Sequence, residues 1–527
     1  MFNRYGSLKI TAAVLASTLL AGCGLLTGGS DDKKETLVVG TTEAPSVLDP
    51  AGAWDGSWAL YRNIFQTLMQ IPISKSTPEP DAAKRCVFKD ADYKVYQCDL
   101  RTDITFSDGE RMDARAVKHS FDRLRSVHEK LGPAPLLAVI RKVETKGDNT
   151  VVFRLKKADA TFPFLLSTPA ASLVSPKAYP KKQLRPGYEI VGSGPYKLKA
   201  YRKGKEAELE KNEDYKGAAK VRNEGVTIRY FQKSGALMKA FRDKQLDVIY
   251  RGLTPHQIQT LQKESTRGDS VDLTENDGSE IRYLAFNTKS SSVSNPAVRK
   301  AIAQMIDRKA LVRNVYQHTA EPLYSMVPSG IPGHTSPFFD LYKDPDTAKA
   351  KSILRSAGID QKVKLTLWYT TDRYGATTAE EFQEIKRQLN GSGLFDVTVK
   401  GKPWDEFQAG YSNGKYAVFG RGWQPDFPDA DNYITPFVGT GNVLSIPNQQ
   451  TKILDDLLPR SRRETNRASA ADSFGEAQKL LAQDARVLPL WQGKIYTASH
   501  PEVAGMDFSV DSATIMRMWE LYTKSSW

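Results

Sequence analysis

Twice along this chain, a strand-like segment is followed by a helix and then by a second strand-like segment. The first set covers residues 226–231, 236–242 and 247–250, and the second covers residues 363–369, 378–389 and 394–400. A helix that crosses over between two strands of one sheet leaves those strands parallel, and parallel strands occur almost only in α/β folds. Because one set lies in each half of the 527 residues, the sequence predicts an α/β chain of at least two lobes.

The N-terminus has the features of a secretory signal. Arg4 and Lys9 precede an apolar stretch over residues 10–20, which is too short to span a bilayer. The next residues, Leu20-Ala21-Gly22-Cys23, resemble the lipobox of bacterial lipoproteins. We therefore expect a signal peptide over residues 1–22, lipid on Cys23 and a polar tether over residues 23–35. The alternative is an ordinary signal peptide with an incidental cysteine. The lipoprotein interpretation predicts a chain anchored at the extracytoplasmic face of the cell membrane.

Two further cysteines, Cys86 and Cys98, flank a segment with two short strand-like runs around a turn. In an oxidising compartment, an even pair of cysteines favours a disulfide bond. A metal site is the competing interpretation, but no histidine or further cysteine lies near them at ligand spacing. Because the six histidines are scattered as well, the sequence predicts no metal site and no cofactor.

The formal net charge of the chain is +13. Basic proteins often bind nucleic acid, but an exported chain seldom meets any. Lys and Arg are also spread along the chain among acidic neighbours, apart from short runs such as residues 460–463. We therefore expect a solvated basic surface and no nucleic-acid partner.

Residues 410–414 match the G-x-S-x-G motif of serine hydrolases, with Ser412 at the centre. A nucleophile elbow must lie between a strand and the helix that follows it. Here a predicted helix over 404–409 precedes the motif and a predicted strand over 416–420 follows it, which is the reverse order. We therefore expect no nucleophile at Ser412 and no enzyme activity. Carboxylate pairs far apart in sequence, as in glycosidases, stay an open alternative.

The loop over residues 421–431 combines an indole with several carboxylates in a stretch that proline stiffens. It follows a strand end, where α/β proteins commonly bind ligands. In the alternative interpretation, Asp429 or Asp431 caps a short helix in an ordinary surface loop. That alternative does not account for Trp423 and Asp426, and the sequence by itself leaves both interpretations open.

Several short motifs occur in an order that resembles family 5 of the extracellular solute-binding proteins, the oligopeptide and dipeptide binders of ABC importers. The motifs are Leu48-Asp49-Pro50, Phe106-Ser107-Asp108-Gly109, Gly192-Ser193-Gly194-Pro195-Tyr196, Val298-Arg299-Lys300-Ala301-Ile302 and Ile306-Asp307-Arg308. Residues 212–215 depart from the pattern of the family, because the expected Pro and Trp are absent there. The shared order, rather than any single motif, carries the resemblance.

The resemblance implies a periplasmic-binding-protein-like fold, with two α/β lobes around a deep cleft and an extra subdomain inserted in the first lobe. Lobe I would comprise residues 36–60, 165–280 and 490–527, the inserted subdomain residues 61–164, and lobe II residues 281–489. Such proteins work by hinge closure: the open lobes bind a solute, and the closed form buries it and is recognised by the transporter. The chain is expected to act as a monomer.

The resemblance also implies a set of ligand-binding residues. In peptide-binding members, an aspartate in the loop over 421–431 pairs with the α-ammonium group of the peptide, and its position here is Asp426, three residues after Trp423. Arg373 resembles the arginine that holds the carboxylate of a dipeptide in some members, with a surface arginine as the alternative. Trp54, Asp55 and Ser57 fall where the first lobe of the family lines the cleft.

The expected function is that of a lipid-anchored solute-binding protein that delivers oligopeptides to an ABC permease of the membrane. Similar proteins bind oligosaccharides, nickel complexes, haem, opines or antibiotics, and the fold does not decide between them. Asp426 favours a ligand with an amine, and scarce histidine disfavours bare nickel. Two functions outside solute import stay open as well: a secreted hydrolase, and a signalling lipoprotein that reports peptides without importing them.

Overall fold

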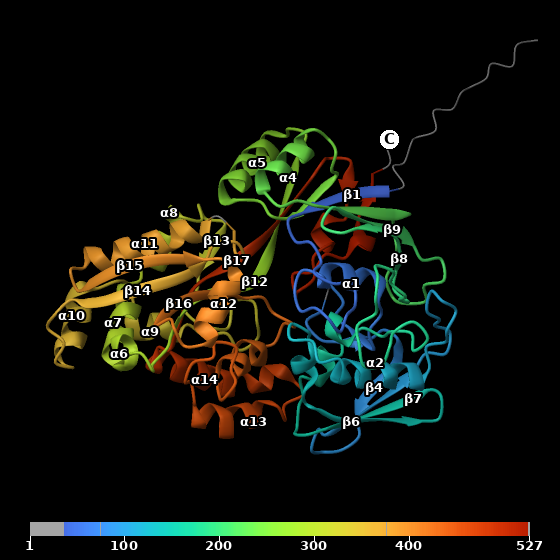
Figure 1. The fold of residues 1–527 in the computed structure, drawn as a ribbon, viewed down its shortest axis with the longest axis horizontal. Helices are drawn as coiled ribbons and strands as arrows, with labels where there is room; N and C mark the ends of the chain where they lie inside the picture. Colours follow the sequence, from blue (N-terminus) through green and yellow to red (C-terminus); the bar gives the residue numbers. More distant parts are fainter. Residues whose placement is uncertain (1–35, 74, 376, 525–527) are drawn as a thin grey trace, which may run out of the picture.

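A computed structural model describes residues 36–73, 75–375 and 377–524 of the chain. These residues form two lobes that share one continuous sheet (Figure 1). Within the described residues the sheet has 11 strands, in the order β15 (Phe395–Lys402), β14 (Val363–Thr370), β16 (Val418–Trp423), β12 (Asp272–Phe286), β17 (Val487–Ser499), β11 (Val248–Arg251), β1 (Thr36–Thr41), β10 (Gly225–Tyr230), β9 (Glu206–Lys211) and β8 (Tyr196–Arg202), with β13 (Ala320–Pro322) paired to β17. The predicted signal peptide, the lipid site at Cys23 and the tether lie outside the described residues.

The first lobe contains the parallel strands β1, β10 and β11. The helix α4 (Ser234–Arg242) crosses over between β10 and β11 and buries Leu237 and Phe241 against the sheet. The sequence predicts β10 and β11 as a parallel pair. They are parallel, but β1 lies between them, since this N-terminal strand is as apolar as its two neighbours and completes the sheet.

A separate antiparallel sheet is attached to the first lobe. It consists of β4 (Ala83–Phe88), β5 (Val95–Leu100), β7 (Thr150–Leu155) and β6 (Ile140–Lys146), in that order. The helix α2 (Ala114–Ser126) covers the sheet because Val117, Phe121 and Leu124 lie on one buried face. Asp113 caps the start of α2 by accepting hydrogen bonds from two backbone N–H groups. This sheet lies within the range predicted for an inserted subdomain.

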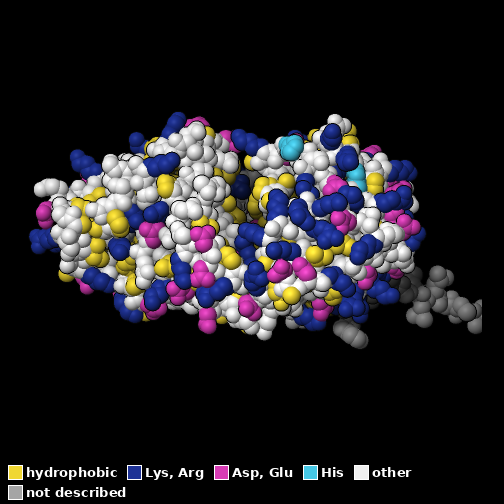
Figure 2. Space-filling model, turned by 90° about the horizontal axis from the view of Figure 1, so that it is seen from below, with side chains coloured by type: hydrophobic (Ala, Val, Ile, Leu, Met, Phe, Trp, Pro, Cys, Tyr) yellow, Lys and Arg dark blue, Asp and Glu magenta, His cyan; other side chains and the backbone are white. Residues whose placement is uncertain are grey.

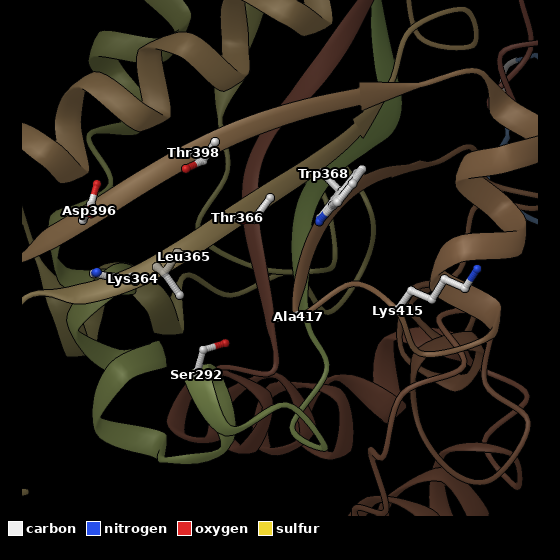
Figure 3. Close-up of a pocket in the computed structure, with 9 residues that line it drawn as sticks. All are labelled: Ser292, Lys364, Leu365, Thr366, Trp368, Asp396, Thr398, Lys415 and Ala417. Atoms are coloured by element: carbon white, nitrogen blue, oxygen red, sulfur yellow. The ribbon is translucent and has the colours of Figure 1, made fainter.

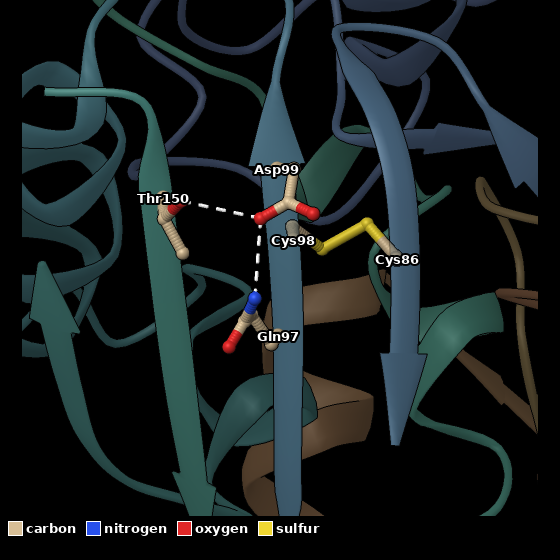
Figure 4. The surroundings of a disulfide bond; sticks show 5 residues. All are labelled: Cys86, Gln97, Cys98, Asp99 and Thr150. Carbon is tan, nitrogen blue, oxygen red and sulfur yellow. Dashed lines mark hydrogen bonds between the residues drawn. A yellow bond between two sulfur atoms is a disulfide. The ribbon is translucent and has the colours of Figure 1, made fainter. Parts of the chain in front are cut away.

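The predicted disulfide between Cys86 and Cys98 is confirmed. The two residues are directly opposite each other on the neighbouring antiparallel strands β4 and β5 (Figure 4). Beside the bridge, Asp99 accepts hydrogen bonds from the Gln97 side chain at 3.1 Å and from the Thr150 hydroxyl at 3.2 Å. The bridge and these bonds connect β4, β5 and β7.

Replacing both Cys86 and Cys98 with Ala should lower the free energy of unfolding of this sheet by about 3 kcal/mol, because the bridge closes a short loop in the unfolded chain. Hydrogen exchange at the amides of β5 and β7 would measure this loss, and reduction of the wild-type protein should reproduce it. Unchanged exchange in the double variant would contradict a stabilising role of the bridge.

The second lobe is built on the parallel strands β14, β15 and β16. The helix α11 (Thr377–Gly391) crosses over between β14 and β15, as the sequence predicts. Successive residues of β12 alternate between two cores, with Leu284 and Phe286 on one side and Tyr283 and Ala285 on the other. The strand is therefore buried on both faces, which explains its apolar run.

In the second lobe, helices cover both faces of the continuous sheet (Figure 1). They are α6 (Ser291–Ser294), α7 (Pro296–Met305), α8 (Arg308–Asn314), α9 (Pro337–Tyr342), α10 (Thr347–Arg355), α12 (Trp404–Ser412), α13 (Leu458–Ser461) and α14 (Ala471–Asp484). The Asn295 side chain caps α7 by accepting from the backbone N–H of Ala297. α10 begins after Asp346, whose side chain accepts from the backbone N–H of Lys349 at 3.0 Å.

The two longest strands, β12 and β17, run antiparallel and pass from one lobe into the other. The start of β12 pairs with the end of β17 beside β11, and the end of β12 pairs with β16. The ladder is interrupted between Asp277 and Ile281, and there the two backbones come close together: a Cβ atom on Gly278 would lie 2.0 Å from the Gly493 carbonyl oxygen. The backbones can approach this closely because Gly278 has no side chain, whereas a Cβ atom on Gly493 would make only ordinary contacts, the nearest at 3.6 Å.

The remaining elements are short or lie at the edges. They are α1 (Trp58–Ile64), α3 (Phe162–Leu165), α5 (Pro255–Arg267), β2 (Met69–Gln70), β3 (Glu79–Pro80), β18 (Val503–Ala504) and β19 (Tyr522–Thr523). In the part of the chain that the structure describes, no helix has the length and apolar character needed to cross a membrane.

Candidate functional site

The carboxyl ends of β14, β15 and β16 meet at one edge of the sheet in the second lobe, because the three strands are parallel. Polar and aromatic residues follow each strand at this edge. Arg373 and Tyr374 follow β14, Trp404 follows β15, and Asp426 follows β16. Such an edge is where α/β proteins commonly bind ligands.

The two lobes are in contact across this edge. The indole Nε1 of Trp54, in the first lobe, donates a hydrogen bond of 2.6 Å to Asp426 Oδ1 in the second. The rings of Phe164 and Phe427 lie 5.9 Å apart, again one from each lobe. Seen from below, Figure 2 shows a furrow between the two halves of the molecule, with Lys and Arg side chains along it. The structure thus describes the lobes in a closed arrangement.

Asp426 is almost fully buried, with 4 % of its surface exposed. Besides the bond from Trp54, its Oδ2 accepts a hydrogen bond of 2.8 Å from Asn432 Nδ2. Asn432 Oδ1 in turn accepts from the Asp426 backbone N–H at 3.0 Å and from Trp423 Nε1 at 3.2 Å. Asn432 therefore fixes the orientation of both Asp426 and Trp423, a role that the sequence does not predict.

No basic side chain among the described residues pairs with Asp426. Burial raises the pKa of its carboxyl group to about 6, although the hydrogen bonds from Asn432 and Trp54 favour the ionised form and act against the rise. The site therefore holds a carboxylate without a counter-charge.

The other two carboxylates of the same loop each have an arginine. Asp429 accepts from Arg467 at 2.6 and 3.0 Å, and Asp431 accepts from Arg462 at 2.9 and 3.0 Å. Asp429 also caps the short 3-10 helix that follows, by accepting from the Asp431 N–H. The capping interpretation thus holds for Asp429, and the two buried ion pairs fix the loop around Asp426.

Of the three residues predicted from the first lobe, one reaches the loop of Asp426. The Trp54 ring lies 6.3 Å from the ring of Trp423, at 78° to it. Asp55 accepts from the Ser46 hydroxyl at 2.6 Å and from the Ser57 N–H at 2.8 Å. The Ser57 hydroxyl accepts from the Ser46 N–H at 3.1 Å. The hydrogen bonds of Asp55 and Ser57 are therefore made within the loop that carries Trp54.

Arg373 is exposed, and its guanidinium carbon lies 4.2 Å from the centre of the Trp404 ring. A second arginine, Arg421 on β16, lies on the same indole at 5.7 Å. Arg421 does not belong to the predicted site residues. Its place beside Trp404 depends on which residues of β14, β15 and β16 are neighbours, and a single sequence does not give that register.

A hollow of about 520 Å³ lies elsewhere, on the face of β14 and β15 between α6 and α12 (Figure 3). Its aromatic residue, Trp368, is stacked on Tyr416 at 4.3 Å and has Lys400 within 5.5 Å. The indole is therefore already covered by the chain itself. Ser412 is the last residue of α12, which agrees with the helix-first order seen in the sequence.

A sequence model of the family "Bacterial extracellular solute-binding proteins, family 5 Middle" matches residues 77–445. The chain belongs to this family. As a family 5 member it is a solute-binding protein, and the predicted family is confirmed. Among the described residues, no cluster of three or more His, Cys, Asp or Glu side chains could hold a metal ion.

Similar proteins bind several kinds of solute. The chain is 24 % identical over 498 residues to the probable D,D-dipeptide-binding periplasmic protein DdpA of Escherichia coli K12, covering 90 % of this chain and 92 % of DdpA. DppA of Helicobacter pylori, solved in complex with the peptide STSA, has a TM-score of 0.79 at 22 % identity over 93 % of this chain and 98 % of DppA. AgaA of A. tumefaciens R10, solved with agropinic acid, has a TM-score of 0.77 at 22 % identity, covering 92 % of this chain and 96 % of AgaA. These structures confirm the predicted two-lobed α/β fold.

One motif of the resemblance has a structural role in this family 5 protein. Asp49 of Leu48-Asp49-Pro50 is buried and accepts hydrogen bonds from both Nη atoms of Arg123 on α2, one of them at 2.9 Å. It also accepts from the backbone N–H groups of Ala51 at 3.0 Å and Arg185 at 2.7 Å. Asp49 thereby connects the segment before Trp54 to the helix of the attached sheet.

Proposed function

We propose that this family 5 protein captures peptides with a free α-ammonium group, buries them between its lobes and delivers them to an ABC permease. Lipid on Cys23 would hold it at the extracytoplasmic face of the membrane. The observation that carries the proposal is the buried carboxylate of Asp426, which has no basic partner among the described residues. The peptides named for DdpA and DppA support the same class of solute.

The physical reason lies in the cost of an unpaired charge. A buried carboxylate without a counter-ion is unfavourable, and an ammonium group supplies both the charge and up to three N–H donors. Asp426 and Trp54 come from different lobes, so a peptide amine at this point contacts both sides of the closed cleft. Binding there stabilises the closed form relative to the open one, which is the requirement for ligand-driven closure.

The proposal predicts that the protein distinguishes free from blocked amines. Protein freed of co-purified solute by reversible unfolding would be mixed with a random pool of dipeptides to pentapeptides, either free or N-acetylated, and the retained peptides identified by native mass spectrometry. We expect the free pool to be retained about 30-fold more strongly or better, since acetylation leaves the Asp426 charge buried and unpaired. Equal retention of the two pools would contradict the proposal.

A second candidate is a small acidic solute of the opine type. AgaA has the same fold, and two arginines, Arg373 and Arg421, lie near the Asp426 loop. The masses of the solutes that co-purify with the untreated protein separate the two candidates, because an opine and a peptide mixture differ in mass pattern.

A further inference from the structure

Phe427 belongs to the second lobe, but its side chain is buried in the core of the first. It follows Asp426 in the loop after β16, and only 4 % of its surface is exposed. The apolar cluster that contains it is otherwise formed by residues of the first lobe and its attached sheet. The ring of Phe427 lies 5.9 Å from the ring of Phe164 within this cluster. A side chain of one lobe is therefore inserted into the other.

The socket that receives Phe427 is fixed to the attached sheet. Phe164 lies on α3, the short helix that follows β7. At the start of the same helix, the ring of Phe162 lies 5.3 Å from the ring of Phe153 on β7 and 5.5 Å from the ring of Tyr96 on β5. Because α3 is packed on the sheet in this way, the contact with Phe427 joins the attached sheet to the second lobe.

A backbone hydrogen bond also crosses between the lobes, close to α3 along the chain. The Ala160 N–H, in the segment between β7 and α3, donates to the Arg462 carbonyl oxygen at the end of α13, at 2.9 Å. The Lys156 N–H donates to the Val139 carbonyl oxygen at 2.8 Å and ties this segment to the attached sheet. The Arg462 side chain donates to the Thr435 hydroxyl within the second lobe at 2.9 Å. Each end of the crossing bond is thus held by its own lobe.

Charged groups surround the same contact. Burial lowers the pKa of Arg462, but the carboxylates of Asp431 and Asp159 raise it, and the net result is a pKa above the ordinary value. Asp431 belongs to the second lobe and Asp159 to the segment after β7, so the guanidinium charge is stabilised from both sides. At the surface, Arg463 forms an exposed ion pair with Asp92 at 3.5 Å, which contributes little by itself.

These contacts lie far from the strands that join the lobes. In Figure 1, α13 and the attached sheet lie at the lower end of the molecule, whereas β12 and β17 pass between the lobes in its upper half. When two lobes rotate about a hinge, the points farthest from the hinge separate the most. Opening therefore breaks these contacts and exposes Phe427 and its socket to water. Because the contacts join protein groups to each other, they stabilise the closed form with or without a solute.

We propose that Phe427, Phe164, Ala160 and Arg462 form a latch, through which the attached sheet stabilises the closed form by itself. The protein without solute would then occupy the closed form for part of the time. Burial of a phenylalanine side chain changes an equilibrium constant by a factor of roughly 10 to 150. The apparent affinity for a solute increases with the population of the form that binds it. The latch therefore strengthens the binding of every solute, whatever its chemistry.

The Ala160 N–H reports directly on the latch, because its acceptor lies in the other lobe. Protein freed of solute by reversible unfolding would be studied by hydrogen exchange resolved at this amide and by small-angle X-ray scattering. We expect protection in wild type, exchange about tenfold faster or more in Phe427→Ala together with a larger radius of gyration, and a smaller change in Phe427→Leu. The matched control is Phe508→Ala, since Phe508 is 55 % exposed, and it should behave as wild type does.

Solute binding gives a second readout. Retention of the free and the N-acetylated peptide pools by Phe427→Ala should fall by the same factor, about fivefold or more, because the latch acts on the population of the closed form. A loss confined to free amines would show that Phe427 acts through Asp426, and the latch would be wrong.

Equal exchange of the Ala160 amide in wild type and Phe427→Ala would also overturn the latch, as would an unprotected Ala160 amide in wild type without solute. If wild type binds no peptide at all, the function proposed above is wrong, but exchange and scattering still decide on the latch. Should Phe427→Ala fail to fold, Phe427→Leu and Phe164→Leu decide in its place, since each removes part of the contact between the two rings.

Discussion

Replacing Asp426 with Asn should weaken the binding of free-amine peptides by about 2–5 kcal/mol, because it removes one partner of a desolvated charge pair. Binding of N-acetylated peptides should not weaken. Isothermal titration with the tightest peptide from the pool would measure both. The matched control is Asp396→Asn, since Asp396 is an exposed carboxylate of the same lobe on β15, and it should bind as wild type does. Equal losses for free and acetylated peptides would indicate a damaged cleft rather than a lost ion pair.

The same pair makes binding dependent on pH. In the protein without solute the pKa of Asp426 is raised to about 6, and a bound ammonium group lowers it because it favours the ionised form. Below pH 6 the carboxyl group carries a proton that must leave when the peptide binds. Affinity should therefore be constant between about pH 6 and the pKa of the peptide amine, which is about 8, and fall roughly tenfold per pH unit below pH 6. In Asp426→Asn the profile should be flat over this range, and an unchanged profile would contradict the role of Asp426.

Removing Arg123 should destabilise the protein by about 3–5 kcal/mol, because its loss leaves the Asp49 carboxylate buried without a counter-charge. The variant Arg123→Met keeps much of the side-chain volume. Urea unfolding, followed by hydrogen exchange in α2, would measure the loss. Arg115→Met is the matched control, since Arg115 lies on the same helix and its exposed side chain pairs with Asp113, and we expect little change there.

The double replacement Asp49→Leu with Arg123→Met tests the physical reason. If the cost comes from an orphaned charge, the double variant should be more stable than Arg123→Met alone, since no charge is left buried. A double variant less stable than either single one would instead show that packing and the backbone bonds of Asp49 dominate.

Local patterns in the sequence predict much of the fold. The unit from β14 through α11 to β15, the hairpin of β8 and β9, and the caps at Asp113 and Asn295 follow from periodicity and capping chemistry. The long strands β12 and β17 do not. Only residues 487–491 of β17 form a short apolar run typical of a strand, and the polar start of β12 around Gly278 has no strand pattern of its own. These segments are strands because they pair with each other over most of their length, and such distant pairing is not visible in one sequence.

In the candidate site, too, some features can be predicted from the sequence and others require the folded structure. Asp426 and Trp423 can be selected from the sequence because a proline-stiffened loop with an indole and carboxylates is unusual, and the family resemblance assigns them a role. The sequence does not show that Asp429 has a basic partner and Asp426 has none, because the partner of Asp429 is Arg467, 38 residues further along the chain. The contact between Arg421 and Trp404 likewise becomes apparent only when β14, β15 and β16 are paired.

The continuous sheet also restricts how the two lobes can separate. Because β12 and β17 remain hydrogen-bonded to each other on both sides of the cleft, the lobes cannot swing independently as they would on flexible linkers. Opening must be a coordinated untwisting of two neighbouring strands, concentrated where Gly278 and Gly493 already interrupt the ladder. The axis of motion is therefore set by strand geometry, and the cleft opens in one fixed direction relative to the two lobes.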